Sequence, residues 1–325
     1  MSTSPMLRAL FAGLFCALLA ACGEGTASTP SSGHPPLPTP TPVGLDTPPP
    51  GTAYLGAYAP GGVGGLEFTM GRKLALDMHY YTWAGLFPSF QETGDVANTR
   101  TPVDSWDCQP SNAQIASGSQ DALIVTRAQA IKAFGHPIFL RYMWDPNLPD
   151  TVLNRQQCHD SSDNSDGTFS ATQFVAAWNH IRAIFAQQGV NNVVWVWSVS
   201  AAGSAPAPYY PGSASVDWVA IDGYDTSGLS SMVPVFSSIY SAVAGYNKPV
   251  LIAETGASST GELQVPYLLS VSPAIQQNFP LVKGFMYYDC CVQSVNGFSW
   301  TLDTAGANAF ATLGSDPLFQ AFGNL

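Results

Sequence analysis

The sequence predicts an α/β fold, a single (β/α)8 TIM barrel preceded by a lipoprotein signal and a Pro-rich linker. Short apolar segments alternate with longer amphipathic segments, as in parallel α/β proteins, and eight of the apolar segments are strand candidates. Residues 52–325 also have the length usual for one such barrel. We therefore expect a signal peptide at 1–21, a tether at 22–51 and one folded domain at 52–325.

The N-terminus has the pattern of an exported lipoprotein. Arg8 is the only charged residue before Cys22, and the 13 residues 9–21 are all apolar. Such a run is a signal-peptide core and is too short to cross a bilayer as a permanent helix. It ends in Leu-Ala-Ala-Cys, which looks like a bacterial lipobox with Cys22 as the lipidated residue. A plain secretory signal with an incidental cysteine is the alternative.

Residues 23–51 are rich in Pro, Thr, Ser and Gly, which predicts an extended tether rather than a core. We therefore expect an exported protein, lipid-anchored to the bacterial cell envelope, with its folded domain outside the cytoplasm. Acyl chains on Cys22 would provide its only contact with the membrane. The sequence indicates no particular protein partner.

Charge and composition narrow the choice of ligand. The net charge of −11, with only 11 Lys and Arg residues, argues against nucleic acid as a partner. Aromatic residues make up 12% of the chain and charged residues 10%. That balance suits a secreted protein that binds neutral, hydroxyl-rich ligands.

The folded domain contains four cysteines, which in an exported protein predict two disulfides. They are Cys108, Cys158, Cys290 and Cys291. Three pairings are possible, and the two adjacent cysteines either bridge each other or pair separately. A zinc site is disfavoured because no His-rich or Cys-x-x-Cys pattern accompanies them.

The eight strand candidates are apolar runs bounded by turn residues. They are 54–58, 73–79, 102–106, 137–141, 192–197, 218–222, 249–254 and 284–288. Helical patterns at 122–134, 171–188 and 232–244 are each followed by a glycine. Thr168 or Ser170 is expected to cap the second of these helices.

Two acidic residues follow apolar strands, where burial is costly unless the carboxyl has a role. Asp145 lies just past the fourth strand candidate, and Glu254 ends the seventh. In such a barrel these positions face each other across the mouth, and glycoside hydrolysis needs such a carboxyl pair. As structural alternatives, Glu254 would pair with Arg141 or cap the next helix, and Asp145 would be a turn residue before Pro146.

The order of several motifs resembles glycoside hydrolase family 26. They lie at 115–141, 174–185 (FVAAWNHIRAIF), 192–198 (NVVWVWS), 209–212 (YYPG), 216–224 (VDWVAIDGY) and 252–256 (IAETG). The resemblance covers residues 54–303, nearly the whole folded domain. It implies a retaining endo-β-1,4-mannanase with Glu254 as the nucleophile and Asp145 as the acid/base.

The chain departs from this family around the acid/base. The family motif is Arg-x-x-His-Glu-Met-Asn, and here Arg141, Trp144, Asp145 and Asn147 occupy its positions. Trp144 stands in place of the His, and Asp145 in place of the Glu. Because Asp is one methylene shorter, its reach to the glycosidic oxygen is the weakest part of the assignment.

Further residues are expected to line the site. By resemblance, Tyr224 hydrogen-bonds the nucleophile and Trp300 forms an exposed platform beneath the sugar, while Trp144 and Asn147 contact substrate. From their strand-end positions, Arg141 would hold Glu254 ionised, and His79 and Trp83 would line glycone subsites. The structural alternatives are a barrel tyrosine, a purely structural ion pair and a barrel-mouth histidine.

The sequence thus predicts a retaining glycosidase that acts on a β-1,4-linked mannan-type polysaccharide or oligosaccharide. The resemblance implies a reaction that requires no metal and no organic cofactor. A β-glucan or xylan substrate is the enzyme alternative, because loop residues set the specificity. A carbohydrate-binding lipoprotein that kept Glu254 but lost an effective acid is the non-enzyme alternative.

Overall fold

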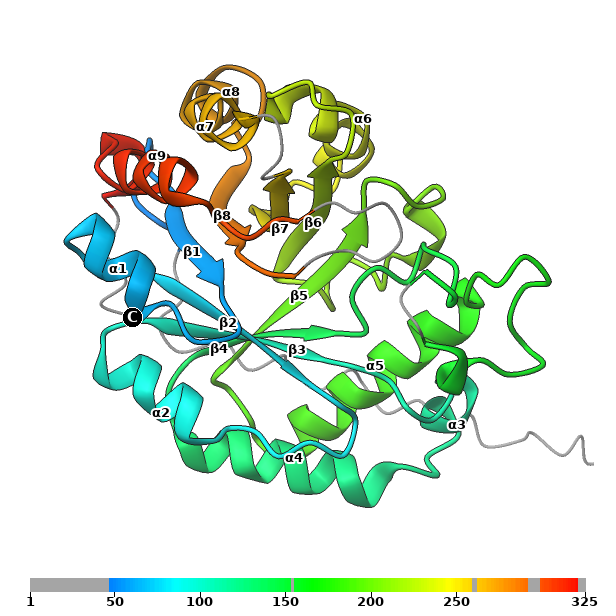
Figure 1. Ribbon diagram of the computed structural model, residues 1–325. Helices are drawn as coiled ribbons and strands as arrows, with labels where there is room; N and C mark the ends of the chain where they lie inside the picture. The colour runs from blue at the N-terminus through cyan, green and yellow to red at the C-terminus, as the bar shows by residue number, and fades with distance from the viewer. Residues whose placement is uncertain (1–46, 153–154, 259–261, 292–298, 321–325) are drawn as a thin grey trace, which may run out of the picture. The chain divides into compact units, whose positions relative to one another are not determined.

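A computed structural model describes residues 47–152, 155–258, 262–291 and 299–320. Its strands form a closed parallel barrel in sequence order, because β1 is bonded to both β2 and β8 (Figure 1). The strands are β1 Tyr54–Tyr58, β2 Leu76–Tyr81, β3 Thr101–Trp106, β4 Ile138–Tyr142, β5 Val193–Ser200, β6 Trp218–Asp225, β7 Val250–Ala257 and β8 Val282–Tyr288. The predicted barrel is confirmed, whereas the signal peptide and Cys22 lie outside the described residues.

The helices lie on the outside of the barrel (Figure 1). They are α1 Gly64–Met70, α2 Phe90–Ala97, α3 Asn112–Ala116, α4 Asp121–Phe134, α5 Ala171–Gln187, α6 Met232–Ala244, α7 Gln264–Leu269, α8 Val271–Gln277 and α9 Thr304–Gly314. Helices α4, α5 and α6 match the three predicted segments. Ser170 caps α5 by accepting a hydrogen bond from the Gln173 amide at 3.4 Å.

Both faces of the strands are buried, one inside the barrel and the other against the helices. Inward side chains such as Met78, Phe139 and Leu251 form an apolar core inside the barrel. Outward side chains such as Trp195 pack on the helices, with the Trp195 ring 5.9 Å from that of Trp178 on α5. The barrel interior is therefore a filled apolar core.

A β-bulge in β7 determines where Glu254 points. Ile221 of β6 pairs with Ile252, but the next β6 residue, Asp222, pairs with Glu254, so Ala253 is the extra residue. Simple alternation from Ile252, which packs outward, would point Glu254 toward the helices. The bulge re-aims Glu254 into the barrel mouth beside Asp222.

The four cysteines pair as Cys108–Cys158 and Cys290–Cys291. The first disulfide joins the loop after β3 to the loop after β4, which carries Asp145. Of the helices among the described residues, none is long and apolar enough to cross a bilayer.

Candidate active site

Glu254 is held by three donors from three different strands. The Tyr80 hydroxyl on β2 donates to Oε1 at 2.7 Å, and the Tyr224 hydroxyl on β6 donates to Oε2 at 2.9 Å. Arg141 on β4 donates through Nη2 to Oε1 at 3.0 Å. With both oxygens fixed and the side chain 8% exposed, Glu254 is a preorganised carboxylate that still faces the mouth.

Arg141 is the central cation of the site. Its guanidinium is fully buried and also donates to Asp222 at 2.5 Å and to Ser198 at 3.0 Å. The carboxylates of Asp222 and Glu254 raise the pKa of Arg141 further above its ordinary value, against the effect of burial. Arg141 therefore stays charged and compensates two carboxylates at once.

A group of aromatic side chains surrounds Glu254. The Tyr80 ring lies 4.8 Å from that of Tyr58, which in turn lies 4.9 Å from that of Tyr288. Burial and the charge of Glu254 raise the pKa of the Tyr58 hydroxyl, so it remains a neutral donor. Rings and hydroxyls in this arrangement suit the C–H faces and hydroxyls of a sugar.

The sequence analysis missed Tyr80, Tyr58, Tyr288 and Asp222. In β2, apolar Leu76 and Met78 alternate with polar Asp77 and His79. Tyr80 lies two residues after Met78, so the same alternation predicts that the Tyr80 side chain also points into the barrel.

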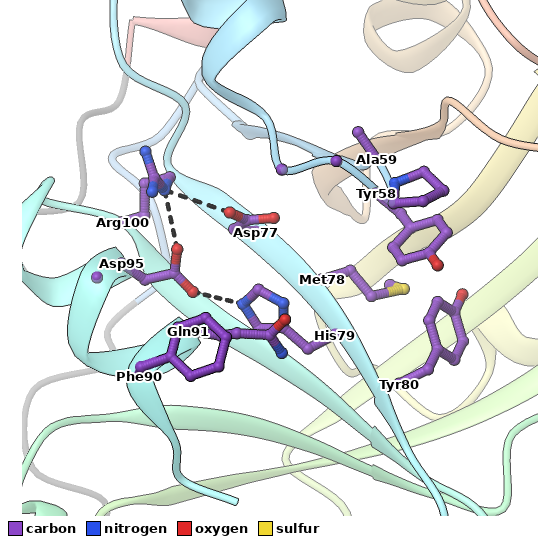
Figure 2. Close-up of a pocket in the computed structure, with 14 residues that line it drawn as sticks. Tyr58, Ala59, Asp77, Met78, His79, Tyr80, Phe90, Gln91, Asp95 and Arg100 are labelled. Atoms are coloured by element: carbon purple, nitrogen blue, oxygen red, sulfur yellow. Dashed lines mark hydrogen bonds and ion pairs between the residues drawn. The ribbon is translucent and has the colours of Figure 1, made fainter.

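The predictions for His79 and Trp83 as glycone-subsite residues are wrong. His79 lies on the outer face of β2, where its Nε2 contacts Asp95 Oδ2 at 2.6 Å, while Tyr80 lies on the other side of the strand (Figure 2). Trp83 is 3% exposed and stacks on Trp106, with ring centroids 4.4 Å apart. Both belong to the layer between the barrel and its helices.

Asp145 lies directly after β4 in the left-handed region, with φ 56°. Its amide donates to Ser198 O at 3.1 Å, which fixes the turn to β5. Burial, and then the negative charge of Glu254, raise the pKa of Asp145 to about 7. A carboxyl with this pKa can donate a proton near neutrality and accept one back.

Asp145 and Asp222 form a carboxyl pair. The two side chains are within hydrogen-bonding reach of each other, and each has a buried Oδ1 that no donor among the described residues reaches. Three carboxyls, including Glu254, surround the single guanidinium of Arg141. We infer that Asp145 and Asp222 share the remaining proton.

Trp144 covers this cluster. Its ring lies edge-to-face with Tyr80 at 5.0 Å, and the Arg155 guanidinium lies 4.0 Å above it. Arg155 in turn pairs with Asp107 at 2.6 Å, next to the Cys108–Cys158 disulfide. Trp144 is thus positioned to contact a ligand above Glu254, and its assignment as a binding residue remains a prediction.

Asn147 holds the loop instead of reaching a ligand, which corrects its assignment to substrate binding. It is fully buried, its amide group donates to Ser200 O and Ser204 O at 2.9 Å each, and its Oδ1 accepts from the Ser200 amide. All of its polar atoms are therefore used by the backbone after β5.

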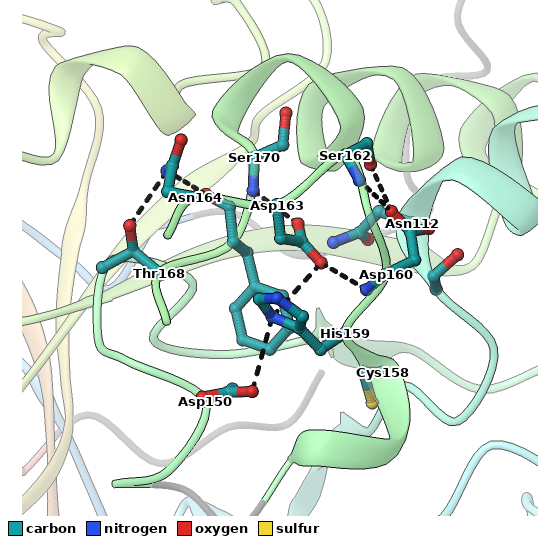
Figure 3. A network of polar contacts seen from close by, with 12 residues as sticks. Asn112, Asp150, Cys158, His159, Asp160, Ser162, Asp163, Asn164, Thr168 and Ser170 are labelled. Carbon is teal, nitrogen blue, oxygen red and sulfur yellow. Dashed lines mark hydrogen bonds and ion pairs between the residues drawn. The ribbon is translucent and has the colours of Figure 1, made fainter. Parts of the chain in front are cut away.

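A polar network further along the same loop fixes its shape (Figure 3). Asp163 accepts hydrogen bonds from the Ser170 amide at 2.6 Å and the Asp160 amide at 2.9 Å. His159 lies between Asp163 and Asp150, 3.4 Å from the latter. The network and the disulfide together hold the segment that presents Asp145.

Trp300 is 2% exposed, so the expected exposed platform is not observed. Its ring stacks on Tyr224 with centroids 4.9 Å apart. A Cβ on Gly256, two residues after Glu254, would lie 3.0 Å from the Trp300 Cβ, so a glycine permits this packing. Trp300 therefore supports Tyr224, whose hydroxyl donates to Glu254.

Comparisons with known proteins identify a similar family. A model of glycosyl hydrolase family 26 matches residues 172–296. Over this segment, which is less than half of the chain, the protein is similar to glycosyl hydrolase family 26. The matched segment contains Asp222, Tyr224 and Glu254, whereas Arg141 and Asp145 lie before it. The family match therefore covers the Glu254 side of the site and not the Asp145 side.

Curated relatives of this chain include two polysaccharide hydrolases by name. Endoglucanase H of Acetivibrio thermocellus is 28% identical over 235 residues, 67% of this chain and 25% of the relative. A mannan endo-1,4-beta-mannosidase of Bacillus subtilis is 30% identical over 125 residues, 36% of this chain and 32% of the relative. The chain thus spans only a quarter to a third of the length of these relatives.

Solved structures support the fold. A Bacillus subtilis mannanase superposes with a TM-score of 0.60 at 17% identity, covering 85% of this chain and 88% of that one. A GH26 beta-mannanase from Bacteroides ovatus superposes with a TM-score of 0.60 at 15% identity, covering 84% of this chain and 91% of that one. At these identities the similarity establishes the barrel and nothing finer.

Proposed function

We propose that the protein is a retaining glycoside hydrolase that cleaves β-1,4-linked mannan-type polysaccharide. The observation that carries the proposal is the fixation of Glu254 by Tyr80, Tyr224 and Arg141 at the C-terminal end of a barrel strand. A carboxylate used only for structure would not need both oxygens oriented toward the open mouth of the barrel.

The proposed reaction has two displacement steps. In the first, Asp145 transfers its proton to the departing glycosidic oxygen while Glu254 forms a bond to the anomeric carbon, which gives a glycosyl-enzyme. In the second, the Asp145 carboxylate takes a proton from water as the water attacks that carbon and releases Glu254. The pKa of about 7 allows Asp145 to serve in both directions.

The substrate class is supported by the names of the relatives rather than by the site itself. One relative is named as a mannan endo-1,4-beta-mannosidase and another as an endoglucanase. Mannan is the first choice because the Bacillus subtilis relative, 30% identical over 125 residues, is named as a mannan endo-1,4-beta-mannosidase. β-Glucan and xylan are therefore tested beside it.

A specific observation favours a second candidate, a carbohydrate-binding lipoprotein without catalysis. The carboxyl of Asp145 is only 5% exposed and faces Asp222. If it does not swing toward the substrate, Glu254 has no acid to assist it. An aryl mannoside with a good leaving group separates the two candidates, since it needs little acid assistance.

The test compares the protein with its Glu254→Ala variant on β-mannan, mixed-linkage β-glucan and xylan, by counting new reducing ends. Glu262→Ala, the loss of an exposed carboxylate in the loop between β7 and α7, is the matched control. Release from mannan by the protein and the control, but not by Glu254→Ala, supports the proposal. No release from any polymer or from the aryl mannoside, with retained oligosaccharide binding, supports the second candidate.

We also propose that Cys22 is lipidated and anchors the exported domain at the cell envelope through the tether 22–51. The lipobox-like Leu-Ala-Ala-Cys motif supports this. Labelling with a radioactive fatty acid should mark the protein but not its Cys22→Ala variant. Equal labelling of both would overturn the proposal.

A further inference from the structure

A second polar cluster lies on the outer face of β2, separated from Glu254 by the barrel wall. Asp77 and His79 project from β2, and Asp95 projects toward them from α2 (Figure 2). His79 Nε2 lies 2.6 Å from Asp95 Oδ2, and Arg100 Nε lies 3.0 Å from Asp95 Oδ1. The space between a barrel strand and its helix is normally filled by apolar side chains, so a group of charges here calls for a role.

These side chains line a cavity of about 480 Å³. It is bounded by β2, by α2, by the loop 59–62 that follows β1, and at one edge by Tyr58 and Tyr80, which also lie near Glu254. The neighbouring helices α1 and α2 have only 7 and 8 residues. Their large side chains Phe68 and Phe90 are 89% and 86% exposed, so neither fills the gap. A small ligand can therefore reach the cluster from solvent.

We propose that Asp77, His79 and Asp95 bind a divalent transition-metal ion such as Zn²⁺. Each residue offers one ligand atom, and these atoms all lie within 4.8 Å of one another. Tetrahedral ligands at about 2.0–2.2 Å from a common ion lie roughly 3.3–3.6 Å apart, so the wider of these separations must close. One imidazole with two carboxylates suits Zn²⁺ and similar ions.

The local charges favour a cation. Asp77 is 4% exposed and lines the cavity, yet its carboxylate accepts no hydrogen bond from an N–H donor of the described residues. Its contact with a positive charge is Arg100 Nε, 3.4 Å away, and Arg100 is shared with Asp95 and Glu67. Lys73 also pairs with Glu67 at 2.9 Å, so two cations serve three buried carboxylates, which leaves one negative charge at the cavity wall.

The ion would replace the direct His79–Asp95 contact, which must open from 2.6 Å to roughly 3.4 Å for tetrahedral ligation.

The ion would complete its coordination with water from the cavity and tie β2 to α2. Tyr80 follows His79 in β2 and donates to Glu254. The site would therefore brace the strand that positions the nucleophile without touching the substrate. This role is separate from the proposed reaction, so the two proposals can fail independently.

The test uses the full chain, stripped of metal with a chelator and then titrated with Zn²⁺. Calorimetry and elemental analysis should give one ion per chain and a Kd in the micromolar range or tighter. Asp77→Asn and His79→Gln should each weaken binding by at least about 100-fold. His180→Gln is the matched control, because His180 and Asp121 form the same 2.6 Å pair without a third ligand, and it should leave binding unchanged.

A measurement on the unaltered protein covers the case in which these variants do not fold. Co²⁺ should give the visible absorption of a four- or five-coordinate nitrogen–oxygen site and raise the midpoint of thermal unfolding. No binding of Zn²⁺ at 100 μM, on the order of the weakest affinity useful for a resident ion, would overturn the proposal. Binding that survives in both Asp77→Asn and His79→Gln would overturn it as well.

Discussion

Replacing Asp145 by Asn should abolish polymer hydrolysis and stabilise the fold at alkaline pH. Asp145 is buried against Asp222 and near Glu254, and its pKa is raised from 3.8 to about 7. Because its folded pKa lies above its unfolded value, the stabilising proton is fully present below pH 4. That stability is lost as the pH rises through about 7. Asn is neutral at every pH and does not show this loss.

The magnitude follows from the difference in pKa. One pKa unit corresponds to about 1.36 kcal/mol, so an ionised Asp145 costs the folded state up to about 4 kcal/mol above pH 7. Asp222 titrates together with Asp145 and the surrounding groups relax, so we expect about 2 kcal/mol. For a domain of this size that is a rise of roughly 4–8 °C in the midpoint of thermal unfolding.

The assay is thermal unfolding followed by circular dichroism, at pH 8 and at pH 4, for the protein and for Asp145→Asn. The gain in midpoint should appear at pH 8 and vanish at pH 4. Asp150→Asn is the control, because Asp150 is also buried but faces His159 and not a second carboxyl, so its midpoint should not rise. Equal differences at both pH values, or a lower midpoint of Asp145→Asn at pH 8, would refute the reasoning.

Three further predictions concern the same cluster. Tyr80→Phe and Tyr224→Phe each remove a hydrogen bond to Glu254 that is worth about 1.5–3 kcal/mol, so kcat/KM on mannan should fall by about 10- to 150-fold. An unchanged value would show that the hydroxyls do not position the nucleophile. Arg141→Met leaves the buried carboxylates without a positive partner, so the free energy of unfolding measured in urea should fall by about 3–5 kcal/mol. A fall of less than about 1 kcal/mol would contradict the role of Arg141 as the central cation. Asp145→Glu extends the acid by one methylene and should increase the rate of mannan cleavage. A slower variant would show that the shorter Asp carboxyl is the one that fits this site.

The rate on mannan should also depend on pH in a defined way. Because Asp145 must be protonated in the first step, kcat/KM should fall as the pH rises above about 7. An aryl mannoside with a good leaving group should show a much weaker fall. A profile for the polymer that stays flat to pH 9 would argue against Asp145 as the acid.

The fold was predictable from the sequence because local patterns specify it. Apolar runs bounded by turn residues located the strands, and a glycine after each helical pattern marked where α4, α5 and α6 end. The direction of Glu254 was not predictable in the same way. Period-2 alternation from Ile252 points it outward, and only the pairing of β6 with β7 reveals the extra residue Ala253.

The remaining site residues depended on contacts between distant segments. His79 and Trp83 were expected in the mouth from their place at a strand end, but His79 lies on the outer face of β2 and Trp83 stacks on Trp106 of β3. Asn147 matched a family motif, yet its amide is used entirely by the β5 loop. A motif fixes the position of a residue in the sequence, but the groups that its side chain contacts belong to segments far away in sequence.

The most direct test of the account is to trap the glycosyl-enzyme with a 2-fluoro mannoside that carries a good leaving group. The fluorine slows the second step, so the covalent sugar accumulates and peptide mass spectrometry can locate it. We predict one sugar per chain on the peptide that contains Glu254, and none on the Glu254→Gln variant. A sugar on another residue, or cleavage of mannan with inversion and no trapped sugar, would contradict the assignment of Glu254 as the nucleophile.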